Sequence, residues 1–495
     1  MDANAIGGLL LPAGLWLLIA AGVPSQHHHR LAAAALIALA IGTLTLVAWG
    51  FAFAFGSRWQ ALSLESDGAR WVFLGLHGFF LQDATDPESI GLLVRLWPLV
   101  AAGALLAAGA VPSHVRLAAV ALFALLVCGL ILPVIACWGW TDGWLARLGE
   151  NADLGRGWVD VGRLSTIGLA TGMASLIWAR LASPREPTPD MPQLPATQFP
   201  VRAVAGVLLS MAGAAALGGY DTPALSSGQF VSGAVAVSAA ILTAGLYTTF
   251  TTRHADVLSA GRAALASVFV TSSAGALLPL PVVVGLGMVC GLLATIGYYV
   301  VHERWGWNDE AAIVTSVLAP SAIGLVCTGV FANGSYGVVG LLSRAELPTD
   351  QLLAQVLGIF AIALFAYSVS RVALWPLRVA PNPAARTVRT SAEPASVLSE
   401  VVATPEPAAM PTAEPAAAQD APVASAQSTV NTAPEQTRRG LFERFKRSNV
   451  AAPTPPKQPR KVAYPYRVGG RPLSARPLAA EDGSASSETT SSHEA

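Results

Sequence analysis

The sequence predicts an all-α integral membrane protein with a long C-terminal tail. Of its 495 residues, 53% are hydrophobic and only 12% are charged, whereas a soluble globular chain carries about 25% charged residues. Residues 31–56 contain no charged side chain, and this run exceeds the roughly 20 apolar residues that a helix needs to cross a bilayer. Because backbone groups find no water in hydrocarbon, each such run is expected to be helical.

Apolar runs of suitable length recur up to residue 377 and predict eleven spanning helices. Their ranges are 5–24, 31–56, 91–112, 115–138, 159–182, 201–219, 228–250, 262–278, 281–301, 311–332 and 352–377. The range 262–278 contains several serines and is the weakest of the set. Residues 71–82 are apolar but too short to span, which indicates an interfacial or re-entrant segment. The Pro-rich segment 184–200 cannot be helical throughout, so it separates five predicted helices from six.

The positions of the arginines favour an external N-terminus, because cytoplasmic loops carry an excess of Lys and Arg. Cytoplasmic loops would then contain Arg30, Arg116, Arg180, Arg185, Arg202, Arg253, Arg262, Arg304, Arg371 and Arg378, and external segments Arg58, Arg70, Arg147, Arg156, Arg163 and Arg344. The bias is ten against six when Arg95, which lies within a span, is left out. An odd number of spans places the C-terminus in the cytoplasm. We expect a multi-pass protein of the plasma membrane.

The composition changes near residue 380, which divides a membrane domain (1–380) from a tail (381–495). Residues 381–437 are rich in Ala, Pro, Glu, Ser and Thr, a composition typical of disorder. The segment 438–471 carries ten Lys and Arg and one acid. Its first ten residues predict a short amphipathic helix that binds anionic lipid or a cytoplasmic partner. The basic residues on that helix are Arg438, Arg439, Arg444, Lys446 and Arg447. The alternative interpretation is a solvated linker with a membrane-surface anchor.

Five motifs occur in a fixed order within residues 5–377. They are WGFAFAFG (Trp49–Gly56), GAVPSHVRLAAVALF (Gly109–Phe123), LPVIACWGWTDGWL (Leu132–Leu145), VDVGRLSTIGLATGMASLIWAR (Val159–Arg180) and WNDEAAIVTSVLAPSAIGLVCTGVFA (Trp307–Ala332). Together they resemble the ammonium transporter and Rhesus glycoprotein family. The fourth motif, for example, is similar to the family pattern DFAGGxVVHxxxGxAxLxxA.

The resemblance implies an ammonium-transporter-like fold of eleven transmembrane helices with two inverted five-helix repeats. It also implies a homotrimer with one pore in each subunit. One feature of the sequence supports the repeat independently, since Asp160 begins the fifth predicted span and Asp309 begins the tenth. Helix N-capping explains both acids. In the family the first acid supports a cation-recruiting site, and capping is compatible with that role.

The resemblance also exposes a departure from the family in the pore. The family carries two pore histidines, each eight residues after its acid, and these positions are Gly168 and Val317 here. The histidines of this chain are His27, His28, His29, His77, His114, His254, His302 and His493. None of them lies in the middle of a predicted span. Neutral imidazoles can relay a proton in a dry pore, whereas glycine and valine cannot.

Other family positions locate a candidate outer mouth. The gate position, where the family has an aromatic residue, falls on Leu99. Trp140 is the best candidate for the tryptophan that cups the cation outside, with Trp138 as the alternative. A Trp face attracts ammonium by a cation–π contact. Interfacial anchoring remains the competing interpretation of both tryptophans.

Two functions are compatible with these features. The first is transmembrane transport of ammonium, ammonia or a related small solute. The second is a non-transporting relative that acts as a sensor or scaffold through its tail. No nucleophile–base pair, phosphate loop or metal-ligand set is recognisable in the sequence, so we expect no enzyme, no cofactor, no bound metal and no nucleic-acid partner. The cysteines lie in apolar stretches, which indicates small apolar side chains: Cys128, Cys137, Cys290 and Cys327.

Overall fold

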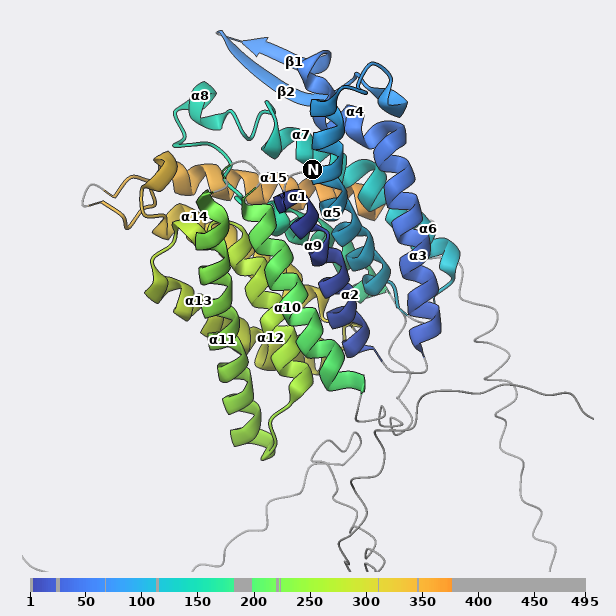
Figure 1. Ribbon diagram of the computed structural model, residues 1–495, viewed down its shortest axis with the longest axis vertical. Helices are drawn as coiled ribbons and strands as arrows, with labels where there is room; N and C mark the ends of the chain where they lie inside the picture. Colours follow the sequence, from blue (N-terminus) through green and yellow to red (C-terminus); the bar gives the residue numbers. More distant parts are fainter. Residues whose placement is uncertain are drawn as a thin grey trace, which may run out of the picture. The chain divides into compact units, whose positions relative to one another are not determined.

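The computed structural model places the helical part of the chain. It describes residues 3–23, 27–66, 68–112, 115–181, 198–219, 222, 224–309, 311–344 and 347–375. All of these belong to one compact unit, Met1–Leu398. The tail predictions, including the basic segment 438–471, lie outside the described residues, as does most of the Pro-rich segment. The described part is a helical bundle with one β-hairpin at one end (Figure 1).

The first half of the bundle contains a helix at each of the first five predicted ranges. These helices are α1 (Ala3–Gly8) with α2 (Leu10–Gly22), α3 (His28–Thr45) with α4 (Phe51–Phe55), α5 (Pro87–Ala110), α6 (Leu117–Leu126) with α7 (Leu132–Trp140), and α9 (Leu164–Leu181). A short surface helix, α8 (Leu148–Ala152), precedes the last of them.

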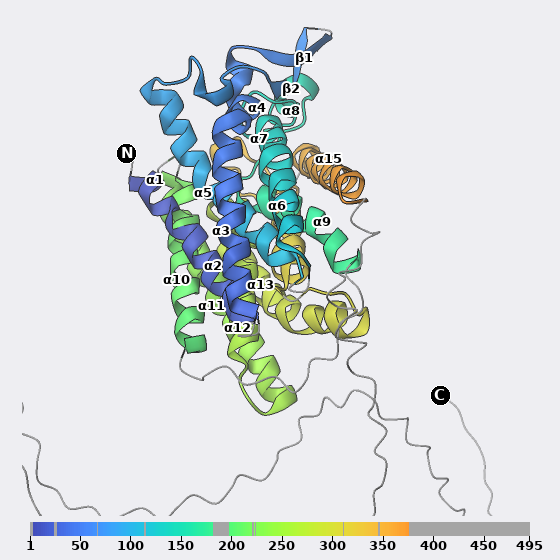
Figure 2. The same cartoon turned by 90° about the vertical axis from the view of Figure 1, so that its right-hand side faces the viewer.

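The second half follows the same plan. Its helices are α10 (Gln198–Gly218), α11 (Ala224–Thr252), α12 (Val257–Ser272), α13 (Leu280–Leu292), α14 (Ala319–Phe331) and α15 (Asp350–Ala373). Figures 1 and 2 show α15 lying across the bundle at a steep angle to α3. The Gln351 and Gln355 amides hold α15 in place by donating to the carbonyls of Gly157 and Val159, both at 2.9 Å.

Within the described residues, eight helical stretches are long and apolar enough to cross a bilayer. The apolar helices at Ile6–Gly22 and Val257–Ser272 are shorter. The helical membrane fold predicted from the sequence is therefore confirmed, while the count of eleven crossings stays a prediction.

Neighbouring helices recur in the two halves. Helix α2 packs on α5 as α10 packs on α12, and α5 packs on α9 as α12 packs on α14. Likewise α3 contacts α5 and α6, and α11 contacts α12 and α13. The fourth and ninth spans each contain a π-helical turn, Val127–Ile131 and Leu293–Gly297. These matching features support two copies of one five-helix unit, and the inverted relation between them stays a prediction.

A β-hairpin forms where the sequence indicated only a short apolar segment. Strands β1 (Ala61–Ser66) and β2 (Ala69–Gly75) pair antiparallel. The backbone N–H of Trp144 donates to the Val72 carbonyl at 3.0 Å. The hairpin thus satisfies its backbone both across the strands and against the loop after α7, which explains how a segment too short to span is held on the bundle.

Candidate functional site

The two acids that begin matching helices both cap them. One carboxylate oxygen of Asp160 accepts from the backbone N–H of Thr166 at 2.6 Å. Asp309 uses both oxygens, accepting from Ile313 N–H at 2.7 Å and Val314 N–H at 3.1 Å. The second oxygen of Asp160, Oδ1, is buried and has no hydrogen-bond partner in the described part of the chain. Capping is therefore present at both acids, and only Asp160 keeps an oxygen for something else.

The two candidate tryptophans at the end of α7 have different surroundings. The Trp138 indole N–H donates to the Phe73 carbonyl at 2.8 Å, and its ring packs 4.9 Å from the Phe365 ring centroid. By contrast, the Trp140 indole nitrogen is buried without a hydrogen-bond partner among the described residues. Trp138 thus anchors the hairpin to the bundle. Trp140 has no such hydrogen bond in the described residues, so it is the better candidate for the outer mouth.

The face of Trp140 is covered by an arginine that the sequence analysis had assigned only to an external segment. The guanidinium carbon of Arg163 lies 5.6 Å from the Trp140 ring centroid. Arg163 is half-buried and follows Asp160 by three residues, so its side chain starts from the same hydrogen-bonded turn as the carboxylate. A carboxylate, an indole face and a cation therefore meet at the start of α9.

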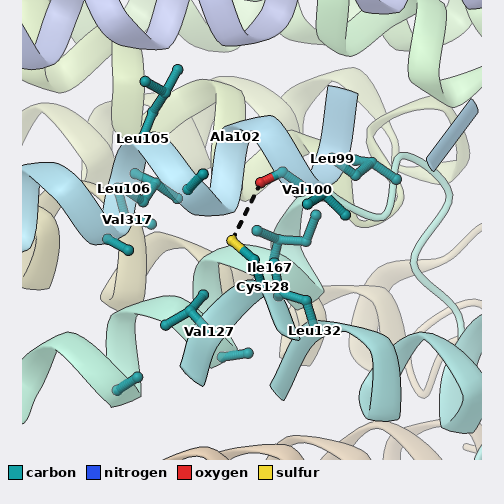
Figure 3. Packing of buried hydrophobic residues seen from close by; sticks show 14 of the residues in the cluster. Leu99, Val100, Ala102, Leu105, Leu106, Val127, Cys128, Leu132, Ile167 and Val317 are labelled. Atoms are coloured by element: carbon teal, nitrogen blue, oxygen red, sulfur yellow. Dashed lines mark hydrogen bonds between the residues drawn. The ribbon is translucent and has the colours of Figure 1, made fainter. Parts of the chain in front are cut away.

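Below Trp140 the interior is filled with apolar side chains. Leu99 is fully buried, and the gap that it lines with Trp140 and Ile167 has no room for a water molecule. Figure 3 shows Leu99, Ile167 and Val317 within one packed cluster, where the Cys128 thiol lies 3.8 Å from the Val100 carbonyl. The predicted path is therefore closed beside Leu99 in this structure.

Gly168, at the first family histidine position, is buried against a phenylalanine. A Cβ built on Gly168 would lie 2.6 Å from the Phe269 ring and would also clash with the Ser321 hydroxyl. Phe269, on α12, is fully buried. One turn further along α9, a Cβ on Gly172 would lie 3.0 Å from the Leu318 Cα. Glycines therefore let α9 approach its neighbours closely, and the space next to Gly168 holds a phenyl ring.

A second buried cation lies in the other half, and it corrects the sequence analysis. Arg262 was assigned to a cytoplasmic loop, but it belongs to α12 and is 9% exposed. Its guanidinium carbon lies 3.8 Å from the Tyr298 ring centroid, and the His302 ring stacks on the same tyrosine. Charge counting placed Arg262 in a loop because it did not use the N-cap signal of Asp256, whose carboxylate accepts from the N–H groups of Leu258 and Ser259 and starts α12 before the arginine.

The comparisons with known proteins agree on one family. The model of the Ammonium Transporter Family matches residues 3–388. The ammonium transporter Amt2 of Archaeoglobus fulgidus is 24% identical over 379 residues, 73% of this chain and 76% of the relative. The ammonium transporter of Bacillus subtilis is 23% identical over 372 residues, 73% of this chain and 86% of that protein. The crystal structure of Candida albicans Mep2 matches with a TM-score of 0.61 at 21% identity, covering 76% of this chain and 84% of that chain.

A family match of this extent includes every described helix. The protein is thus an integral membrane protein with the fold of the ammonium transporters. The chain belongs to the ammonium transporter family, as the five ordered motifs predicted.

Proposed function

We propose that this protein moves ammonium, ammonia or a related small solute across a membrane. The observation that carries the proposal is the family match over residues 3–388, which takes in the whole helical unit. We propose transport and not catalysis as the role, and the proposal invokes no cofactor or metal.

The proposed path begins at an outer mouth formed by Trp140 and Asp160, passes a gate at Leu99 and continues between Gly168 and Val317. Support comes from the burial of Leu99, Gly168 and Val317 within the bundle. A path that is lined by Leu99, Val317 and the Ser321 hydroxyl beside Gly168, and that has no imidazole, offers a bare cation little compensation for its lost water. That loss costs between about 3 and more than 10 kcal/mol. Neutral ammonia is therefore the species that we propose to cross.

The path opens only if side chains move, because no water fits beside Leu99 in this structure. Leucine and phenylalanine side chains at Leu99 and Phe269 can change rotamer without breaking any hydrogen bond of their own. We propose that these two residues form the closed state of the path.

The family resemblance and the arginine distribution support the remaining assignments. We propose a homotrimer in the plasma membrane, with the N-terminus outside and the tail in the cytoplasm. The tail would be disordered apart from residues 438–447, whose basic side chains would bind anionic lipid at about 1 kcal/mol each. A peptide of residues 436–450 should bind anionic vesicles and dissociate at high salt. Equal binding to neutral vesicles would show that charge is not the cause.

The transport proposal is tested in proteoliposomes that contain a pH indicator. External ammonium chloride supplies ammonia, and entry of the neutral form raises the internal pH. We expect faster alkalinisation than in protein-free vesicles of the same lipid and size. Equal rates would contradict transport and favour the sensor or scaffold alternative.

A further inference from the structure

We propose that Arg163 occupies the outer cation position itself and thereby excludes ammonium ions from it. Arg163 would be a specificity-determining residue that reserves the path for a neutral solute. This inference rests on the proposed function, because it assumes that Trp140 and Asp160 form the outer mouth.

The backbone of Arg163 provides the first argument. Its φ of 61° lies in the left-handed region, which disfavours residues with a Cβ and suits glycine. The turn itself is fixed, since Arg163 N–H donates to the Asp160 carbonyl at 3.2 Å and the Arg163 carbonyl accepts from Ile167 N–H at 3.3 Å. In the family pattern DFAGGxVVH, the residue three after the acid is glycine. A glycine would therefore satisfy this turn without strain, and the arginine requires a reason beyond the backbone.

The side chain of Arg163 supplies that reason. Its guanidinium carbon, 5.6 Å from the Trp140 ring centroid, is within the range of about 6 Å for a cation–π contact. It also lies on the same turn as Asp160, whose Oδ1 is buried without a hydrogen-bond partner in the described residues. An indole face and a carboxylate are the two groups that would attract a small cation here. The guanidinium group of Arg163 already covers the indole face, and it belongs to the same turn as the carboxylate.

An arriving ammonium ion would therefore meet a like charge at the position that should attract it. The ammonium ion could bind only by displacing the guanidinium group of Arg163. That group is tethered beside the site, so its effective concentration there is always high. Neutral ammonia is not repelled in this way. Arg163 therefore disfavours cations at the outer end of the path, and the largely apolar interior disfavours them further in.

The test compares equilibrium binding of methylammonium to four purified full-length proteins, measured by calorimetry. They are the wild type, Arg163→Gly, Arg163→Lys and the double variant Arg163→Gly/Trp140→Leu. Arg163→Gly removes the tethered charge and relieves the positive φ, so it should fold. Arg163→Lys keeps the charge on a flexible chain and serves as the matched control. Size-exclusion elution and thermal midpoints verify that each protein is folded.

We expect Arg163→Gly to bind methylammonium at least about tenfold more tightly than the wild type. Arg163→Lys should remain close to the wild type, and the double variant should lose the gain because the indole face is gone. The proposal is overturned if a folded Arg163→Gly variant gains no affinity. It is equally overturned if the double variant keeps the gain, because the site would then not involve Trp140.

The two proposals fail in distinguishable ways. A wild-type protein that does not accelerate ammonia entry into vesicles contradicts transport, while the binding comparison still reports whether Arg163 occupies the cation position. A transporting wild type with unchanged methylammonium affinity in Arg163→Gly contradicts only the role of Arg163.

Discussion

Asp160 and Asp309 occupy matching positions in the two halves, yet each half supplies a cation near its acid in a different way. In the first half the cation is Arg163, held on the same turn as Asp160 with a φ of 61° and half-buried over Trp140. In the second half it comes from another helix, as Arg262 of α12, which is 9% exposed and lies on Tyr298.

This difference separates a structural cation from a functional one. Arg262 is enclosed by the bundle and cannot leave Tyr298 without opening the packing around α12. Arg163 lies on a half-buried turn, and its positive φ is a backbone conformation that suits glycine better. The first half also leaves one oxygen of Asp160 unused, whereas capping consumes both oxygens of Asp309. We therefore assign stability to the Arg262 cluster and solute selection to the Arg163 turn.

The largest expected effect is the loss of the enclosed cation. Arg262→Ala leaves a cavity in the packing around α12 and removes the cation–π contact with Tyr298, which together should cost about 3 kcal/mol. Arg163→Ala is the matched control and should cost less than about 1 kcal/mol, because its side chain is partly solvated. Thermal or denaturant unfolding in detergent measures both. Equal losses would remove the distinction between the two cations.

A second prediction concerns Gly168, the interior position at the first family histidine. Gly168→Ala should destabilise the fold by about 1–3 kcal/mol, because its methyl group would overlap Phe269 and Ser321. The control is Gly285→Ala on α13, where no atom lies within 4 Å of the added Cβ. That change should be neutral or stabilising by up to about 1 kcal/mol. A harmless Gly168→Ala would show that Phe269 does not fill the space beside Gly168.

Capping at the two acids should also differ, by a smaller amount. Asp309→Ala removes two hydrogen bonds to helix N–H groups, and Asp160→Ala removes one. Loss of a cap costs about 0.5–2 kcal/mol, so we expect Asp309→Ala near the upper end and Asp160→Ala near the lower end. Unfolding midpoints of the two variants provide the comparison. The reverse order would mean that Asp160 has a larger structural role than its hydrogen bonds indicate.

The smallest effect should distinguish the two tryptophans. Trp138→Phe keeps the ring packing on Phe365 but removes the hydrogen bond to the Phe73 carbonyl, at a cost of about 1 kcal/mol. Trp140→Phe removes an indole N–H that has no partner among the described residues and should change stability by less than about 0.5 kcal/mol. A larger loss for Trp140→Phe than for Trp138→Phe would reverse the assignment of anchor and mouth.

The sequence predictions that the structure confirms depend on local features of the chain. Long apolar runs identify helices by themselves, so each predicted span contains a described helix. The capping role of the acid before each repeat helix could also be predicted, because capping acts within a few residues of the same chain. The sequence analysis identified the apolar segment 71–82 as too short to span but did not predict its strand, although the dipeptide Asp67-Gly68 between Ala61–Ser66 and Ala69–Gly75 is a sequence typical of a hairpin turn.

The features that define the candidate site are not local. Phe269 reaches Gly168 from α12, and neither residue signals the other in the sequence. Arg163 looked like an ordinary external charge, although one signal was available, since it replaces a glycine of the quoted family pattern. The positive φ that gives this replacement its meaning became visible only with the backbone in place.

In the proposed mechanism the path admits a neutral solute and Arg163 keeps cations from its mouth. Its most direct test is the electrical current across a membrane of wild-type proteoliposomes after a jump in external ammonium, recorded on vesicles that show faster alkalinisation. We expect no ammonium current above that of protein-free vesicles. A saturable ammonium current in the wild type would contradict it, because a charged species would then be crossing past Arg163.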